Sequence, residues 1–516
     1  MSHERPELTD LRARLLRNTD EARPDAVLRR RKTSQRTVRE NIADLVDEGT
    51  FVEYGALVLA AQRNRYSDDE LVSKSPADGL VTGVGAIDGT RTMVLAYDYT
   101  VFAGTQGLNG HRKLDRMLSL AAEWRSPVVL FAEGGGGRPN DTDLPVVAGL
   151  DVPSFLRFAA LSGLAPRVGI VSGRCFAGNA ALLGLCDVVI ATEDSTIGMG
   201  GPAMIEGGGL GTFTPEEVGP IDLQTKSGVV DVRVKDEAEA VAVAKRYLGY
   251  FRAAIAPAWT AADQAPLRDA MPERRRRAYR VRPIVERIFD VDSVLELRRD
   301  FGKSMLTALA RIEGRAVGVL ANDCWEGAGA IDSDAADKAA RFLQLCDAFG
   351  LPVISLCDTP GFMVGPKAEA TGLVRHTARM FVAAASLTVP HLTIVLRKAY
   401  GLGAQAMGGG HLGAGVFAAS WPTGEFGAMG LEGAVKLAMG KELAAMPNEA
   451  DRAEAFKAMV DFAYDRGKAM NTAAHHEVDA VIDPADTRAW IAGGLAFALD
   501  GEAKREPRRR RFIDTW

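Results

Sequence analysis

Residues 89–104, GTRTMVLAYDYTVFAG, and residues 314–329, GRAVGVLANDCWEGAG, repeat one pattern within a chain of 516 residues. In each copy an apolar run leads to an aspartate, and an Ala-Gly pair closes the segment. The similarity extends over residues 89–182 and 314–407 at a constant spacing of 225, with 18 identities in 94 positions and no gap. Self-similarity at a fixed spacing indicates a duplicated structural unit. The sequence therefore predicts two copies of one domain.

Short apolar runs alternate with helical stretches in both copies, which is typical of an α/β fold. The runs that read as buried strands are 128–132, 168–171, 188–191, 317–321, 353–357 and 392–396. Residues 257–283 are rich in Pro and Arg and poor in core residues, so the boundary is expected there. We predict an N-terminal helical segment over 1–50, a domain over 51–260, a linker over 261–300 and a second domain over 301–516.

Composition excludes several classes of protein. The net charge is -5, from 62 Lys and Arg against 67 Asp and Glu, which gives no global attraction to nucleic acid or anionic membrane. Five cysteines without a C-x-x-C pair argue against a disulfide framework and a four-cysteine zinc site. The N-terminus lacks a secretory apolar segment, and no apolar run reaches membrane-spanning length. We expect a cytoplasmic protein without a metal.

Glycine-rich turns follow two of the apolar runs in each copy. They are EGGGGR at 133–138, SGRCFAG at 172–178, DTPGF at 358–362 and RKAYGLG at 397–403. Glycine lets peptide N–H groups approach a ligand, and a helix that begins after such a turn presents unpaired N–H donors. Paired donors of this kind form oxyanion holes for enolates or tetrahedral oxyanions. Any single turn could equally be an ordinary strand-to-helix connection.

Other motifs carry less weight. The G-x-G-x-x-G at 408–413 does not follow an apolar strand, and neither a G-x-x-x-x-G-K-[ST] nor a G-x-S-x-G sequence occurs. The pair His475-His476 is better explained by a solvated helix face than by a metal site. The arginine runs at 274–277 and 508–511 are interpreted as solvated linker and tail, with a phosphate contact as the alternative.

Several longer stretches are similar to one known family: DYTVFAG at 98–104, DTPGFMVG at 358–365, RKAYG at 397–401 and WPTGEFGAM at 421–429. The chain resembles the carboxyltransferase (β) subunit of biotin-dependent acyl-CoA carboxylases, of the propionyl-CoA and methylcrotonyl-CoA carboxylase type, over most of residues 30–490. The resemblance implies a tandem of two crotonase-like domains. It also implies a homo-oligomer, usually a hexamer, with the active site between the N-domain of one subunit and the C-domain of another.

The resemblance implies a specific reaction as well. Carboxybiotin on a separate carrier releases CO2, the freed biotin takes a proton from the acyl-CoA α-carbon, and the enolate captures the CO2. Two backbone oxyanion holes hold the thioester oxygen and the biotin ureido oxygen. The chain has no biotinylation site and no space for a biotin carboxylase domain, so the expected partner is a biotin carboxylase and carrier (α) subunit.

Site residues follow from the family motifs. Gly135 and Gly136 are expected to donate to the thioester oxygen, with Ala177 and Gly178 along the acyl-CoA. The biotin side is expected to use Leu402 and Gly403, with Gly361 and Phe362 nearby, and Gln405 is expected to face the acyl chain. Among the positions that depart from the motifs, Gly134 replaces Ser, Phe176 replaces Ala, Leu402 replaces Gly and Gly403 replaces Ala.

Two further functions stay open. One is a carboxyltransferase subunit of a biotin-dependent decarboxylase complex, which runs the reaction in reverse. The other is a non-catalytic assembly subunit, motivated by the altered residues Leu402 and Gly403.

Overall fold

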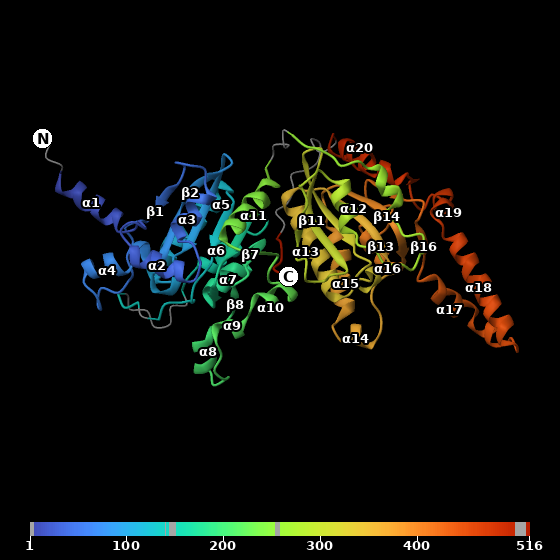
Figure 1. Cartoon of the computed structure of the whole chain (residues 1–516), viewed down its shortest axis with the longest axis horizontal. Helices are drawn as coiled ribbons and strands as arrows, with labels where there is room; N and C mark the ends of the chain where they lie inside the picture. Colours follow the sequence, from blue (N-terminus) through green and yellow to red (C-terminus); the bar gives the residue numbers. More distant parts are fainter. Residues whose placement is uncertain (1–4, 140, 144–150, 253–257, 501–511) are drawn as a thin grey trace. The chain divides into compact units, whose positions relative to one another are not determined.

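The computed structural model describes residues 5–139, 141–143, 151–252, 258–500 and 512–516 (Figure 1). It divides into two compact units, Met1–Gly249 with Thr515 and Tyr250–Asp514 with Trp516, called unit 1 and unit 2 below. Over the described ranges, none of the helices combines the length and the apolar character needed to cross a bilayer.

Unit 1 is built on a seven-stranded mixed sheet with the order β1-β2-β3-β4-β5-β7-β9. The strands β1 to β3 pair antiparallel, and from β3 onward the pairs are parallel. The strands are β1 Val52–Tyr54, β2 Leu80–Ile87, β3 Thr90–Tyr97, β4 Val128–Phe131, β5 Arg167–Val171, β7 Val188–Thr192 and β9 Val232–Val234. A separate pair joins β6 Arg174–Phe176 to β8 Thr196–Gly198. The central strands are wholly buried, as their continuous apolar runs predict.

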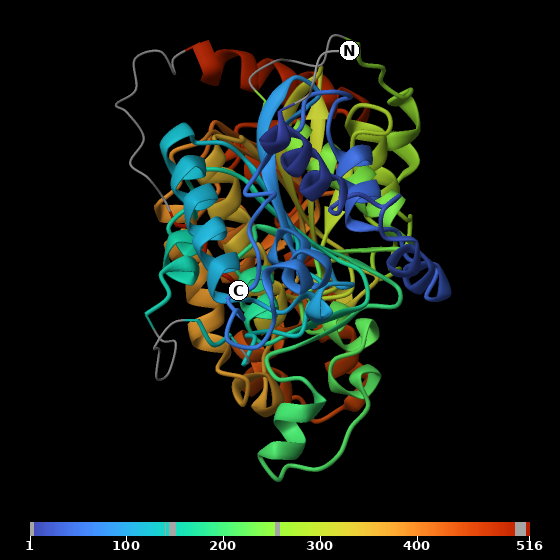
Figure 2. The ribbon, with the colours of Figure 1, turned by 90° about the vertical axis from the view of Figure 1, so that its left-hand side faces the viewer.

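Unit 1 also contains helices on and around this sheet. They are α1 Pro6–Leu16, α2 Pro24–Lys32, α3 Val38–Leu45, α4 Asp68–Lys74, α5 Leu108–Trp124, α6 Ser154–Ala159, α7 Gly178–Gly184, α8 Pro202–Gly207, α9 Pro215–Val218, α10 Ile221–Lys226 and α11 Glu237–Gly249. A capping box between Thr37 and Glu40 begins α3. Helix α5 buries one face against the strands, including Leu114 and Met117. The green segment with α8 and α9 extends away from the sheet of this unit (Figures 1 and 2).

Unit 2 repeats the design with an eight-stranded sheet in the order β10-β11-β12-β13-β14-β15-β17, and β16 also pairs with β14. The strands are β10 Leu295–Leu297, β11 Met305–Ile312, β12 Arg315–Asn322, β13 Val353–Thr359, β14 His391–Tyr400, β15 Phe417–Ser420, β16 Glu425–Gly427 and β17 Ala480–Val481. The helices are α12 Arg282–Ile288, α13 Ser333–Phe349, α14 Pro366–Glu369, α15 Leu373–Ala385, α16 Gly401–Met407, α17 Leu431–Ala444, α18 Glu449–Arg466, α19 Ala469–Ala474 and α20 Thr487–Asp500.

Strand register confirms the duplication. Met93 of β3 pairs with Val128 of β4, and the residues 225 positions later, Gly318 and Val353, pair in the same way. Helices α5 and α13 keep the same spacing.

The spacing falls to 224 at the next strand, because Val128 pairs with Arg167 whereas Val353 pairs with His391. The connection between these strands is therefore one residue shorter in unit 2, and the gapless alignment is wrong beyond it. Gly178 corresponds to Leu402, and Asn179 corresponds to Gly403.

A buried lysine occupies the same place in both units. Lys113 of α5 donates to the carbonyl oxygens of Ala77 and Leu80. Lys338 of α13 donates to Phe301 O at 2.9 Å and Met305 O at 2.6 Å. Burial lowers the pKa of Lys113 to about 8 and the pKa of Lys338 to about 7. Each lysine fixes the long helix to the backbone beside the first strands of its unit.

Residues 261–300, expected as a linker, contribute secondary structure to unit 2. They include α12 and β10, and Tyr279, Val281 and Phe289 are buried in the core of that unit. The division between the units falls at Gly249 and Tyr250. The high Arg and Pro content of this segment concealed its few but well-buried apolar residues.

Candidate functional site

The first glycine loop, residues 134–137, follows β4 and lies against the start of α7. Gly134, the first residue of the loop, is bound to β6. Its N–H donates to Arg174 O at 2.8 Å, and its carbonyl oxygen accepts from Phe176 N at 2.9 Å. A Cβ on Gly136 would lie 2.6 Å from the Cβ of Ala177. Gly136 also has a φ of +89°, so both its backbone conformation and its contact with the helix start require glycine.

The second glycine loop, residues 359–362, follows β13 and lies against the start of α16. A Cβ on Gly403 would lie 2.7 Å from Gly361 Cα and 3.0 Å from Phe362 N. Each unit therefore places a loop after one parallel strand beside the helix that follows the next. This arrangement brings together Gly135, Gly136, Ala177 and Gly178 in unit 1, and Gly361, Phe362, Leu402 and Gly403 in unit 2.

The two N–H groups predicted as donors in unit 1 already have acceptors within the chain. Gly135 donates to Ala103 O at 3.1 Å, and Gly136 donates to Asn179 Oδ1 at 3.0 Å. In the part of the chain that the structure describes, the N–H groups of Gly137 and Gly178 donate to no acceptor. The assignment of Gly135 and Gly136 as donors to the thioester oxygen stays a prediction, whereas the free N–H groups at this place are those of Gly137 and Gly178.

A signal for this difference was present in the repeat. The residue that corresponds to Gly135 in unit 2 is Pro360, which has no N–H group. An oxyanion donor shared by both copies could therefore not lie at this position. The remaining loop position, Gly137, corresponds to Phe362. The two residues form equivalent isolated parallel bridges, Gly137 with Gln106 and Phe362 with Ile331.

The site in unit 2 has free N–H groups on both its loop and its helix. Among the described residues, the N–H groups of Phe362, Leu402 and Gly403 donate to no acceptor, whereas Gly361 donates to Thr359 Oγ1 at 3.1 Å. Leu402 and Gly403 are in the first turn of α16, where the helix leaves N–H groups unpaired. Leu402 is 60% exposed. Gln405 is exposed on the same helix.

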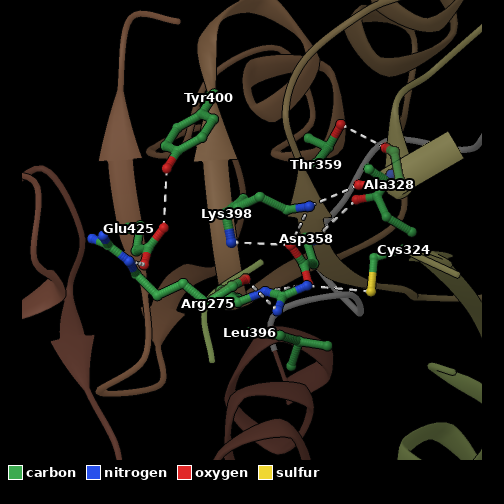
Figure 3. A network of polar contacts seen from close by, with 12 residues as sticks. Arg275, Cys324, Ala328, Asp358, Thr359, Leu396, Lys398, Tyr400 and Glu425 are labelled. Atoms are coloured by element: carbon green, nitrogen blue, oxygen red, sulfur yellow. Dashed lines mark hydrogen bonds and ion pairs between the residues drawn. The ribbon is translucent and has the colours of Figure 1, made fainter. Parts of the chain in front are cut away.

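A buried carboxylate holds the ends of β13 and β14 beside the second loop (Figure 3). Asp358 accepts from Arg397 Nε and from the Lys398 backbone N–H, each at 3.1 Å, and from the Tyr279 hydroxyl at 2.7 Å. Lys398 Nζ extends past Asp358 to donate to Ala328 O at 2.7 Å. Because Asp358 is fully buried and multiply hydrogen-bonded, this network fixes the loop.

Unit 1 has a carboxylate at the corresponding position, Glu133. Its carboxyl group pairs with Arg30 of α2 at 2.8 Å, and burial raises the pKa of Glu133 to about 7. At the far end of the first loop, Arg138 forms a buried ion pair with Asp78 at 2.5 Å. The loop is thus fixed on both sides by charged contacts.

The arginine run at 274–277 makes contacts within unit 2. The Arg275 guanidinium lies 3.4 Å from the Tyr464 ring centroid, and Arg276 pairs with Glu432 at 2.6 Å. The run at 508–511 lies outside the described residues. No group of His, Cys, Asp and Glu side chains within the described ranges could hold a metal ion.

Comparison with known proteins gives consistent matches. The family model for the carboxyl transferase domain matches residues 29–513. The methylmalonyl-CoA carboxyltransferase 12S subunit of Propionibacterium freudenreichii subsp. shermanii is 34% identical over 89% of this chain and 88% of its own length. The solved transcarboxylase 12S hexamer with methylmalonyl-CoA bound superimposes with a TM-score of 0.84 at 30% identity, covering 98% of this chain and 96% of that one.

A single-chain, multi-domain long-chain acyl-CoA carboxylase of known structure is more similar in sequence. It is 54% identical, with a TM-score of 0.89 over 95% of this chain. The chain spans about half of that multi-domain protein, 49% of its length.

Proposed function

Because the chain belongs to the carboxyl transferase domain family, we propose that it moves a carboxyl group from carboxybiotin on a partner protein to the α-carbon of an acyl-CoA. The observation that carries this proposal is the pair of matched sites, one in each unit, where a glycine loop lies against a helix start with free N–H groups. Two sites of one design suit a reaction in which two carbonyl oxygens become more negative. We further propose that both units are crotonase-like domains.

Unit 1 is proposed to hold the acyl-CoA. The N–H groups of Gly137 and Gly178 would donate to the thioester oxygen, whose negative charge grows as the α-proton leaves. These donors are fixed before the reaction because Gly135 and Gly136 are hydrogen-bonded to the rest of the unit. Preorganised backbone donors of this kind favour the enolate over the neutral thioester, which lowers the barrier to proton removal.

Unit 2 is proposed to hold the biotin. Biotin supplies the carboxyl group and then a base for the α-proton. The N–H groups of Phe362, Leu402 and Gly403 match an acceptor such as the ureido oxygen, which gains negative charge when the carboxyl group departs. The 12S hexamer named above supports a homo-oligomer as the working assembly, and the similarity to a biotin-dependent long-chain acyl-CoA carboxylase beta4 subunit supports a biotin-bearing partner.

A substitution that removes one N–H group tests the biotin side. Leu402→Pro deletes the donor at a first-turn helix position that tolerates proline, and Leu402→Ala keeps it. In biotin-stimulated decarboxylation of malonyl-CoA or methylmalonyl-CoA, the proline variant should lose about 10²–10³-fold in kcat and the alanine variant less than about threefold. Equal rates for the two folded variants would refute the role of this donor.

The same assay separates the alternatives. A chain that binds no acyl-CoA and decarboxylates no malonyl-type thioester, yet is needed for assembly of a carboxylase, would be the non-catalytic subunit. Comparison of short-chain with long-chain acyl-CoA substrates in the reconstituted carboxylation reaction would establish the substrate. Gln405→Ile should alter that preference if Gln405 faces the acyl chain, and unchanged relative rates would remove it from the pocket.

A further inference from the structure

The second loop is held by a hydroxyl that makes two hydrogen bonds at once. Thr359 Oγ1 donates to Gly329 O at 2.8 Å and accepts from Gly361 N at 3.1 Å. These bonds connect the loop to the turn that precedes α13. Thr359 is fully buried, so the bridge is part of the interior of unit 2.

The first loop has the same two bonds from a different residue. Asn179 Nδ2 donates to Gly104 O at 3.3 Å, and Asn179 Oδ1 accepts from Gly136 N at 3.0 Å. Gly104 and Gly136 are the residues that correspond to Gly329 and Gly361 in the repeat. Asn179 has no exposed surface and bridges the same pair of backbone groups as Thr359.

The bridging side chain comes from opposite sides of the two sites. In unit 2 it stands on the loop, at Thr359, and the corresponding helix residue is Gly403. In unit 1 it stands on the helix, at Asn179, and the corresponding loop residue is Gly134. Each site therefore has one bridging side chain and one glycine, in exchanged positions.

Geometry explains why both positions cannot carry a side chain. A Cβ on Gly134 would lie 2.3 Å from Asn179 Nδ2 and 2.3 Å from Gly104 O. The amide of Asn179 and the carbonyl oxygen of Gly104 thus both occupy the space that a side chain at 134 would need. The residues at 134 and 179 therefore depend on each other. The bridge that is lost with the departure from Ser at 134 is supplied by Asn179.

We propose that Asn179 is the positioning residue of the first loop and replaces a loop hydroxyl in holding the Gly137 N–H against the start of α7. Because it is fully buried and its amide is used by the chain, it acts through the loop and does not touch substrate. The effect on rate rests on the proposed function, but the exchange of positions is a property of the fold alone.

A double substitution tests the exchange. Asn179→Ala removes the bridge, Gly134→Thr alone places a side chain against Asn179, and Gly134→Thr with Asn179→Ala installs the arrangement of unit 2. Each single variant should lose about 10²-fold in kcat for biotin-stimulated malonyl-CoA decarboxylation, because a displacement near 1 Å has effects of that size. The double variant should regain part of the activity lost in Gly134→Thr, because the Asn179 amide is gone, but it should stay below the parent, because the added Cβ still lies 2.3 Å from Gly104 O. KM should change less than kcat.

Thermal unfolding of the same four proteins provides a readout that does not depend on catalysis. The double variant should unfold at a higher temperature than Gly134→Thr alone, since removal of the Asn179 amide leaves one of the two close contacts. Additive losses of stability would overturn the exchange, and so would an active, folded Asn179→Ala. A parent protein with no carboxyltransferase activity would refute the proposed function, while the unfolding data would still decide the exchange.

Discussion

Gly403→Ala is expected to impair the biotin side of the reaction while leaving the chain folded. The added Cβ would lie 2.7 Å from both the Cα and the carbonyl carbon of Gly361, whereas ordinary contacts begin at 3.4 Å. All three neighbouring atoms belong to the backbone, so either the second loop or α16 must move by roughly 0.7 Å, the difference between these distances. A displacement near 1 Å at reacting groups costs about 10²-fold in rate. We therefore expect kcat to fall about 10²-fold, which corresponds to about 2.7 kcal/mol of barrier.

Biotin-stimulated decarboxylation of malonyl-CoA measures this rate, and calorimetry measures acyl-CoA binding in parallel. Acyl-CoA affinity should stay within about twofold, because unit 1 is unchanged, whereas overpacking should reduce the stability of unit 2 by about 1–3 kcal/mol. Gly493→Ala is the matched control, since a Cβ there meets no atom within 4 Å. Full activity of a folded Gly403→Ala protein would refute the assignment of this contact to the site.

Three further outcomes concern the fold of unit 2. Lys338→Met should destabilise it by about 2–4 kcal/mol in urea unfolding, because two buried carbonyl groups, Phe301 O and Met305 O, lose their donor. The folded pKa of Lys338, about 7, lies below its ordinary value of 10.5, so the unfolded chain binds this proton more readily between these pH values. The contribution of Lys338 to the free energy of unfolding is therefore lost as pH falls toward 7 and grows as pH rises. The penalty of Lys338→Met should thus be larger at pH 9 than at pH 7, by at most about 1.4 kcal/mol per pH unit. A penalty that does not change with pH would contradict the lowered pKa. Trp421→Phe should cost about 1–3 kcal/mol in the same measurement, because the hydrogen bond from the buried indole to Thr487 Oγ1, 2.8 Å long, is lost; an unchanged midpoint would show that this bond adds nothing.

Much of the fold could be predicted from local pattern. The repeat at residues 89–104 and 314–329 is visible because equivalent strands and turns lie at one constant spacing. The strands after which the glycine loops begin are continuous apolar runs, and such runs mark parallel strands buried on both faces. Residues 261–300 were harder to interpret, because their contribution to unit 2 depends on a few buried side chains within a charged segment.

The sequence by itself determined that the protein has two copies of one α/β unit, each with a glycine loop followed by a helix start. Tertiary structure decided which N–H groups remain free, because the acceptors are distant in sequence: Gly136 bonds to a side chain 43 residues away. It also revealed that the spacing of the repeat changes by one residue, so that Asn179 corresponds to Gly403. The strand pairing shows this change, whereas the count of identities conceals it. The exchange of Thr359 for Asn179 depends on space shared by two segments. The residue pattern of a single segment cannot show which atoms of a distant segment fill the space beside it, because only folding brings the two segments together.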